Sequence, residues 1–331
     1  MQVPLDAIAL TSRLAYNANY PNMRLITVKG ENKFETALQD DDGNVYPLRD
    51  ALDSGRDMLA TTPGLLDLID LWSIYRPMVI GLGEQIVKGE VQPRPSLEVA
   101  APFPYPRRDA FAIAGNYRQH MEAARTTTGV DFERRKGPVF FVKPTGSFVG
   151  PTDSIVFDPD YTQAVDYEVE LGVVLGKGGR DISADSALDH VFGYMVVNDV
   201  SARDQLLRNK PMIDFFRGKG ADTFFPMGPG VTPRDWAPAH NDLELRLWVN
   251  GELRQSGSTR EMVRGVEEIV AELSRSVTLQ AGDIIATGTP SGVAIEMEDP
   301  KYLQDGDVVK AEIEGLGFLL NSVRSRSADS G

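Results

Sequence analysis

Two glutamates stand two residues apart at the start of an apolar run. Glu168 and Glu170 lie in the stretch DYEVELGVVL, residues 166–175. In a strand, residues i and i+2 point to the same face, so both carboxylates lie side by side. Like charges repel at that spacing unless water or a cation separates them. A solvated strand face is the alternative, but residues 171–175 are apolar on both faces, which favours glutamates placed at the mouth of a core.

A third carboxylate, Asp199, follows the apolar run 193–197. Its position predicts the end of a second strand, although a cap for the following turn would explain it equally well. Three carboxylates from two neighbouring strands would suit a hard cation such as Mg²⁺ or Mn²⁺, with water completing the coordination. Glu168, Glu170 and Asp199 are therefore candidate ligands of a divalent metal.

Three further side chains could act on a substrate held at such a site. His120 follows a strand and a turn and could serve as a general base, or simply be polar surface; His190 and His240 are expected to be structural or exposed. Lys219, in a glycine-flanked loop, could meet a carboxylate or oxyanion, although most lysines are exposed. Thr289 belongs to TGTPSG, residues 287–292, a turn whose amides and hydroxyls suit an anionic group. That turn lacks the lysine and spacing of a P-loop, so no nucleotide or organic cofactor is expected.

The elements that must position these residues are mostly short strands separated by glycine turns. Strands are predicted over residues 111–114, 139–142, 169–175, 194–198, 243–249 and 284–287, with a hairpin over 308–314 and 318–323. A capping box at Ser258 and Glu261 predicts a helix with apolar positions from 262 to 273, and a short helix is expected over 184–191. Many strands and few helices favour a β-rich α+β fold over a doubly wound sheet.

The part before residue 106 shows no cluster of chemically active side chains. It is predicted to hold strands over 24–29 and 34–38, a polar turn at 40–44, a strand resuming at 45 and a helix over 65–75. Five prolines in residues 92–108 indicate an extended connector. We therefore expect a small N-terminal structural α+β domain with its connector over 1–105, a catalytic domain over 106–325 and a frayed tail over 326–331.

Composition excludes several classes of function. The 34 Lys and Arg against 48 Asp and Glu give a net charge of −14, which disfavours nucleic acid and anionic membranes as partners. The chain has no cysteine, so disulfides, thiolate metal sites and cysteine nucleophiles are excluded. No apolar run is long enough to span a membrane and no signal peptide is recognised, so a cytoplasmic protein is expected.

Six segments, in the same order along the chain, resemble the fumarylacetoacetate hydrolase family. They cover about residues 110–323 and are Gly115-Asn116-Tyr117-x-x-His120, Phe140-Phe141-Val142-Lys143-Pro144, Glu168-x-Glu170-Leu171, Asn198-Asp199-Val200-Ser201-Ala202-Arg203-Asp204, Gly218-Lys219 with Asp222-Thr223-Phe224, and residues 282–293. The resemblance implies a β-roll of mixed sheets, usually dimeric, and one Mg²⁺ or Mn²⁺ per subunit on Glu168, Glu170 and Asp199. It also implies His120 as catalytic base, Lys219 as a substrate-side cation and Thr289 as a substrate contact.

Two positions depart from the family pattern. Many acylpyruvate hydrolases of the family carry a glutamate three residues after the histidine, where this chain has Ala123. Glu122 cannot replace it on a helix, because residues i and i+2 do not face each other. A distant carboxylate, Glu296 or Glu298, could substitute. The other departure is Leu206, where the family often has glutamine; here Gln205 comes one place earlier.

The expected activity is hydrolysis of a carbon–carbon bond in a small anionic β-diketo acid of the acylpyruvate type. His120 would activate water, Lys219 would stabilise an oxyanion, and residues 120–137 could close as a lid. The alternative is a decarboxylase or an enol/keto isomerase acting on an oxaloacetate-type 2-oxo acid at the same metal, which would not need a water attack. A ligand-binding or structural protein with a vestigial metal site is the remaining alternative.

Overall fold

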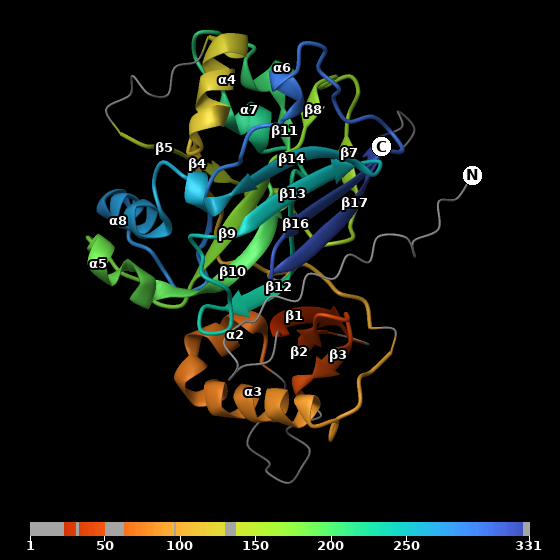
Figure 1. Cartoon of the computed structure of the whole chain (residues 1–331), viewed down its shortest axis with the longest axis vertical. Helices are drawn as coiled ribbons and strands as arrows, with labels where there is room; N and C mark the ends of the chain where they lie inside the picture. The colour runs from red at the N-terminus through yellow and green to blue at the C-terminus, as the bar shows by residue number, and fades with distance from the viewer. Residues whose placement is uncertain (1–22, 31–32, 50–62, 96, 130–136, 327–331) are drawn as a thin grey trace.

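The chain folds around one large sheet that continues from its N-terminal part into its C-terminal part (Figure 1). The structure is a computed structural model and describes residues 23–30, 33–49, 63–95, 97–129 and 137–326. Within these residues, the ten-stranded sheet has the order β3-β2-β1-β12-β10-β9-β15-β4-β5, with β6 pairing alongside β12. A five-stranded sheet, β14-β13-β16-β17-β7, and the pair β11-β8 complete the strands. The predicted β-rich α+β fold with mixed sheets is confirmed, since parallel and antiparallel pairs both occur.

The N-terminal part forms the lower lobe in Figure 1. Its elements are β1 (Met23–Lys29), β2 (Phe34–Asp40), β3 (Val45–Pro47), α2 (Leu65–Asp70) and α3 (Trp72–Val87). The predicted strands and turn are confirmed. The single helix expected over 65–75 is wrong in extent: it breaks at Leu71, and α3 continues to Val87 because its apolar face goes on through Leu82 and Ile86, which are buried.

This lobe is joined to the rest of the chain by strand pairing. β1 runs antiparallel to β12, with Leu25 opposite Val231. Gly230 allows this approach, since a Cβ there would lie 2.4 Å from the Leu25 carbonyl oxygen. The front strands thus extend the large sheet, while the division of the chain at residue 105 stays a prediction.

The middle of the chain supplies the strands that carry the site. Its elements, in order, are β4 (Ala110–Ala114), α4 (Arg118–Thr128), β5 (Val139–Lys143), η2 (Thr145–Ser147), β6 (Phe148–Val149), β7 (Ile155–Phe157), β8 (Val165–Asp166), β9 (Val169–Leu175), α5 (Ala184–Ala187), η3 (Leu188–His190), β10 (Val191–Asn198), β11 (Ser201–Ala202), α6 (Arg203–Leu206) and α7 (Phe215–Lys219). The helix expected over 184–191 is confirmed only in part, because α5 ends after one turn and continues as η3.

β9 and β10 form the buried centre of the large sheet, and every residue of both is buried. Val169, Leu171 and Val173 pack in a core shared with the five-stranded sheet and α8, whereas Val174 packs in a second core shared with α2 and α3. Because both faces of β9 are covered, its sequence is apolar without alternation. Any charged side chain at the end of this strand therefore enters a largely water-free environment.

The C-terminal part adds β12 (Phe225–Pro233), β13 (Glu244–Val249), β14 (Glu252–Ser258), η4 (Thr259–Glu261), α8 (Val266–Ser276), β15 (Ile284–Ala286), η5 (Ala294–Glu296), β16 (Val308–Ile313) and β17 (Gly317–Ser325). The expected hairpin is confirmed as the antiparallel pair β16–β17. The expected helix starts later than its capping box indicates, because Ser258 is held in β14 opposite Glu244 and its hydroxyl caps only η4. Strand pairing overrides the local capping signal here.

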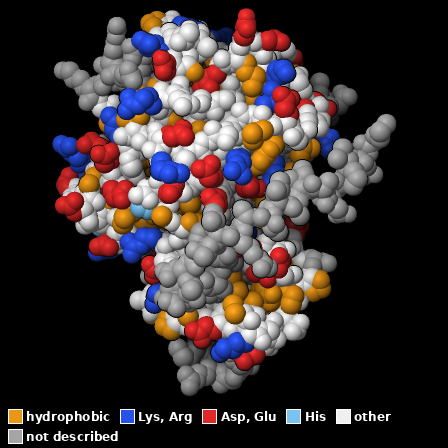
Figure 2. Space-filling view, in the orientation of Figure 1, with side chains coloured by type: hydrophobic (Ala, Val, Ile, Leu, Met, Phe, Trp, Pro, Cys, Tyr) orange, Lys and Arg blue, Asp and Glu red, His pale blue; other side chains and the backbone are white. Residues whose placement is uncertain are grey.

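Several short strands had no sequence prediction. β12 is the longest of them. It was not predicted because it contains Pro226, Gly228, Pro229 and Gly230, and proline and glycine are uncommon inside strands. On the face shown in Figure 2, basic and acidic side chains are interspersed, and the coloured residues there show no continuous basic patch. Within the described ranges, no helix is both long and apolar enough to cross a membrane.

Candidate active site

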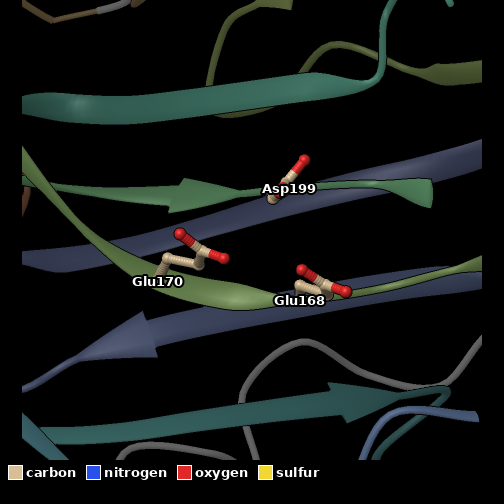
Figure 3. Close-up of side chains that lie close together, drawn as sticks. All are labelled: Glu168, Glu170 and Asp199. Carbon is tan, nitrogen blue, oxygen red and sulfur yellow. The ribbon is translucent and has the colours of Figure 1, made fainter. Parts of the chain in front are cut away.

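The register of two strands brings three carboxylates together. β9 and β10 run antiparallel with Glu170 opposite Val197, and the Asp199 main-chain N–H donates to the Glu168 carbonyl at 2.9 Å. Glu168, Glu170 and Asp199 are 4%, 1% and 1% exposed. One carboxylate oxygen of each lies within 4.8 Å of the others. Figure 3 shows the three side chains close together on neighbouring segments. The solvated strand face considered for the glutamates is therefore wrong.

Three buried cations surround this trio. The Lys219 ammonium donates to Glu168 Oε2 and to Asp199 Oδ2, both at 2.7 Å. Lys143 Nζ lies 2.8 Å from Asp199 Oδ1, and Arg203 Nη2 lies 2.6 Å from Glu168 Oε1. Lys219 is 4% exposed and is the last residue of α7, so both the exposed lysine and the predicted loop are wrong for it. The Asp199 carboxylate binds two lysines and does not cap the turn.

Burial and the surrounding charges together shift the pKa values of Glu168 and Glu170 in opposite directions. Burial alone would raise the pKa of Glu168, but Lys219 and Arg203 outweigh it and lower that pKa to about 2. Burial, together with Asp199 and Glu168, raises the pKa of Glu170 well above its ordinary value. Glu170 Oε2 accepts the Gly288 main-chain N–H at 2.7 Å, which does not offset these effects. Burial lowers the pKa of Lys143 to about 8, although Asp199 opposes that change.

This donor set fits a divalent cation. Carboxylate oxygens are the ligands that Mg²⁺ and Mn²⁺ prefer. Within the cluster, Asp166, Glu168, Glu170 and Asp199 outnumber the buried cations Lys143, Arg203 and Lys219 by one. Burial is the main cause of the raised pKa of Glu170, and the neighbouring carboxylates Asp199 and Glu168 add to it. A bound cation would offset that negative charge.

His120 lies beside the trio and is oriented by a distant glutamate. It is on α4, lines the same cavity as the three carboxylates, and its Nδ1 lies 2.5 Å from Glu296 Oε1. Glu296 ends η5 and also accepts the Gly292 main-chain N–H at 2.7 Å. Of the two distant carboxylates considered, the structure thus places Glu296 on His120. Glu122 is exposed on the same helix.

Thr289 lines the cavity, but its hydroxyl is committed to the protein. The hydroxyl donates to the Val169 carbonyl at 2.9 Å and accepts from Gln255 Nε2 at 2.8 Å. Gln255 Oε1 in turn accepts the Val169 main-chain N–H at 3.0 Å. The side chain of Thr289 therefore ties the 287–292 turn to β9, and its role as a substrate contact stays a prediction.

The rest of the cavity wall is apolar. Phe141 and Phe215 stack with their ring centres 4.7 Å apart, and Leu206 lies beside them, where the family pattern suggested glutamine. The remaining apolar lining comes from Ile113, Ala114, Ala124, Leu207, Ile213 and Ile295. Part of the predicted lid, residues 130–136, lies outside the described residues, as does most of the predicted tail, 327–331.

Three residues of the site, Lys143, Arg203 and Asp166, had no predicted role. Lys143 and Arg203 occur in the motifs that carry the family resemblance, and that placement was the available signal for them. Asp166 precedes the glutamates by two residues, and its carboxylate accepts from Arg203 Nε at 2.8 Å. Glu296 was named only as a possible partner for His120. Nothing in the local sequence around residue 120 indicates a contact 176 residues away.

Comparisons with known proteins show the family to which the chain belongs. Residues 109–324 match the family model described as fumarylacetoacetate (FAA) hydrolase, C-terminal. The oxaloacetate tautomerase YisK of Bacillus subtilis is 40% identical over 227 residues, which is 69% of this chain and 73% of that protein. The human mitochondrial oxaloacetate tautomerase FAHD2A is 41% identical over 231 residues, 69% of this chain and 71% of its own length.

Two solved structures extend the similarity to most of the chain. The fumarylacetoacetate hydrolase from Exiguobacterium antarcticum superposes with a TM-score of 0.74 at 38% identity, covering 92% of this chain and 100% of that one. The maleylpyruvate hydrolase from Sphingobium sp. SYK-6, solved in complex with manganese(II) and pyruvate, has a TM-score of 0.69 at 29% identity, with coverage of 92% and 100%.

Proposed function

The chain belongs to the fumarylacetoacetate hydrolase family, and on that premise we propose that it is a divalent-metal-dependent keto–enol tautomerase of a small 2-oxo acid of the oxaloacetate type. The observation that carries this proposal is that His120, which contacts Glu296, lines the same cavity as Glu168, Glu170 and Asp199. Both relatives described above that are named tautomerases support it. The expected carbon–carbon hydrolysis is less well supported and becomes the second candidate.

The residues present can carry out the required proton transfer. Tautomerisation moves one proton from the enolic oxygen to C3 and breaks no carbon–carbon bond. Because Nδ1 of His120 faces Glu296, Nε2 is the nitrogen left to take the proton from oxygen and return it to carbon. Glu296 would stabilise the positive charge on the ring between these two steps. We therefore assign proton transfer to His120 and its orientation to Glu296.

The remaining groups would bind and orient the substrate. A divalent cation held by Glu168, Glu170 and Asp199 would, when bound, polarise the 2-oxo group as a Lewis acid. Lys219 uses two of its three N–H bonds on Glu168 and Asp199, which leaves one for a substrate oxygen. The apolar wall around Phe141 and Phe215 would limit the access of water to the enolate.

Hydrolysis of an acylpyruvate-type substrate is the second candidate, because the same pair could draw a proton from water. Chelated oxaloacetate could also lose CO₂ without any general base. Three assays run in parallel separate these reactions: decay of enol absorbance with C3 deuterium exchange in D₂O, pyruvate release from acylpyruvates, and CO₂ release from oxaloacetate. Each is run with Mg²⁺, with Mn²⁺ and with a chelator.

The tautomerase proposal expects metal-dependent enol decay that falls by a factor of roughly 10² to 10⁴ in His120→Asn. His240→Asn is the matched control, because His240 also contacts a glutamate, Glu267 at 3.2 Å, but lies outside the cavity lining. Pyruvate release without tautomerisation would transfer the assignment to the hydrolase. Enol decay at the uncatalysed rate with every metal would refute the proposal.

A further inference from the structure

Asp166 is a fully buried carboxylate that the mechanism above does not use. It is 0% exposed and is not part of the cavity lining. Its Oδ1 accepts the main-chain N–H groups of Tyr167 and Ala294, both at 2.8 Å. Its Oδ2 accepts the Ile295 N–H at 3.1 Å and Arg203 Nε at 2.8 Å. Each oxygen thus receives two donors, so the accepting capacity of the carboxylate is filled.

Two of those donors lie at the start of the turn that ends at Glu296. Ala294 and Ile295 are the first residues of η5, a three-residue turn that ends at Glu296. So short a turn has almost no internal hydrogen bonding, and its first N–H groups need an outside acceptor. Asp166 supplies it. Beyond the turn, Glu296 reaches His120, and Ile295 lines the cavity.

The same carboxylate is linked to the trio on its other side. Arg203 donates from Nε to Asp166 and places Nη2 2.6 Å from Glu168 Oε1. Contacts therefore run without a gap from Glu168 through Arg203 and Asp166 to the turn, and from Glu296 to His120. All of these groups are at least largely buried, so the geometry at one end restrains the other.

We propose that Asp166 is a positioning residue that holds Glu296 against His120 by anchoring the 294–296 turn. The proposal rests on the proposed function only insofar as His120 matters for turnover. The alternative is that Asp166 satisfies buried N–H groups and stabilises the fold without any effect on His120.

The substitution Asp166→Asn separates the two, because all four partners of Asp166 are donors. The asparagine amide has only one oxygen. Its NH₂ group must therefore face either Ile295 and Arg203 or Ala294 and Tyr167. At least one N–H of the turn then loses its acceptor at nearly unchanged side-chain volume. The control is Asp204→Asn at an exposed position: Asp204 accepts from Thr162 Oγ1 at 2.6 Å and from the Gln163 N–H at 3.1 Å, with no contact to the turn.

The first measurement needs no activity. The chain has three histidines, so ¹⁵N-histidine labelling gives three ring systems, with His120 assigned by His120→Asn. In the Mg²⁺-loaded protein, the His120 Nδ1–H resonance is expected in the wild type and in Asp204→Asn. It is expected to be lost or broadened in Asp166→Asn, as in Glu296→Gln. An unchanged His120 resonance in folded Asp166→Asn would overturn the proposal whether or not the tautomerase assignment holds.

The second measurement is a double-mutant cycle on kcat. If Asp166 acts through Glu296, Asp166→Asn lowers kcat by the factor seen for Glu296→Gln, and the double variant is no slower than the slower single variant. Fold losses that multiply would overturn the proposal. Should Asp166→Asn not fold, Asp166→Glu takes its place with the same outcomes, since it keeps the charge for Arg203 but displaces the acceptors of the turn by one methylene.

Discussion

Glu168 and Glu170 stand two residues apart, yet neutralising them should change the stability of the metal-free protein in opposite directions. Glu168 binds Lys219 and Arg203, whereas Glu170 receives one main-chain N–H and lies beside two other carboxylates. Glu168→Gln therefore removes an attraction, and Glu170→Gln removes a repulsion. Both glutamines keep the shape of the side chain, and the Glu170 variant can still accept from Gly288.

The magnitudes follow from the geometry. The pKa of Glu168 is about 2 instead of 4.5, and each tenfold change in proton affinity corresponds to about 1.4 kcal/mol, so its charge stabilises the fold by on the order of 3 kcal/mol. Glu170 lies within 4.8 Å of the like charges of Glu168 and Asp199. One pair of unit charges at that distance repels by roughly 3 kcal/mol at an effective dielectric constant of about 20. Lys219 offsets part of this repulsion, which leaves a net gain of about 1–2 kcal/mol on neutralisation.

Thermal unfolding in a chelator and in excess Mn²⁺ measures both effects. At about 2 °C for each kcal/mol in a chain of this size, Glu168→Gln is expected to melt about 6 °C below the wild type in the chelator, and Glu170→Gln about 2–4 °C above it. Mn²⁺ at about 100 times its dissociation constant should stabilise the wild type by about 2.7 kcal/mol. It should stabilise Glu170→Gln much less, so the order of these two proteins reverses.

Glu122→Gln on α4 is the control, because it removes a carboxylate of the same type from an exposed position. It should shift neither curve. A Glu170→Gln protein that melts below the wild type in the chelator would refute the charge argument. Equal stabilisation of Glu170→Gln and the wild type by Mn²⁺ would refute the assignment of Glu170 as a metal ligand.

Three further predictions follow from the same cluster and its surroundings. Lys219→Met removes the ammonium shared by Glu168 and Asp199, so the metal-free protein should lose about 3–5 kcal/mol in urea unfolding and recover more than the wild type does on adding Mn²⁺. In the metal-free protein, the stability difference between the wild type and Glu168→Gln should narrow as the pH falls from about 4.5 toward about 2. The reason is that a carboxylate with a lowered pKa loses its stabilising charge only across that range. Urea titrations in a pH series measure this difference. Gly292 has φ of +107° and a Cβ there would lie 2.2 Å from the Arg254 carbonyl oxygen, so Gly292→Ala should cost at least about 2 kcal/mol in thermal unfolding.

The local pattern of the sequence indicated the three carboxylates as candidates, although it left a solvated face and a turn cap open. The spacing of Glu168 and Glu170, followed by residues 171–175 without polar alternation, indicates charged groups at the entrance of a doubly covered strand. The structure confirms this, since β9 is buried throughout. Asp199 was predicted for a similar reason, at the end of an apolar strand. Signals of this kind depend on a few neighbouring residues, which is why they can be read from the chain directly.

Contacts between distant segments could not be predicted in this way. His120 lies on a helix whose own glutamate faces elsewhere, and its partner comes from η5, 176 residues later. Lys143 is fully buried against Asp199, although an isolated lysine at the end of a strand is usually exposed. The true start of α8 was missed because Ser258 belongs to β14. In each case tertiary packing decides between local alternatives of similar free energy.

The distribution of charge also ties metal binding to substrate binding. Lys219 donates hydrogen bonds to Glu168 and Asp199, whereas the negative charge of Glu170 is the least compensated of the three carboxylates. A 2-oxo acid brings at least one more negative charge into a cluster that already has a carboxylate in excess, and burial makes that addition costly. The cavity should therefore accept the anion only after a divalent cation has reversed the local charge. Affinity for an unreactive 2-oxo acid analogue, measured by calorimetry with and without Mn²⁺, should be lost in the chelator and restored in part by Glu170→Gln alone; tight binding to the metal-free wild type would contradict this coupling.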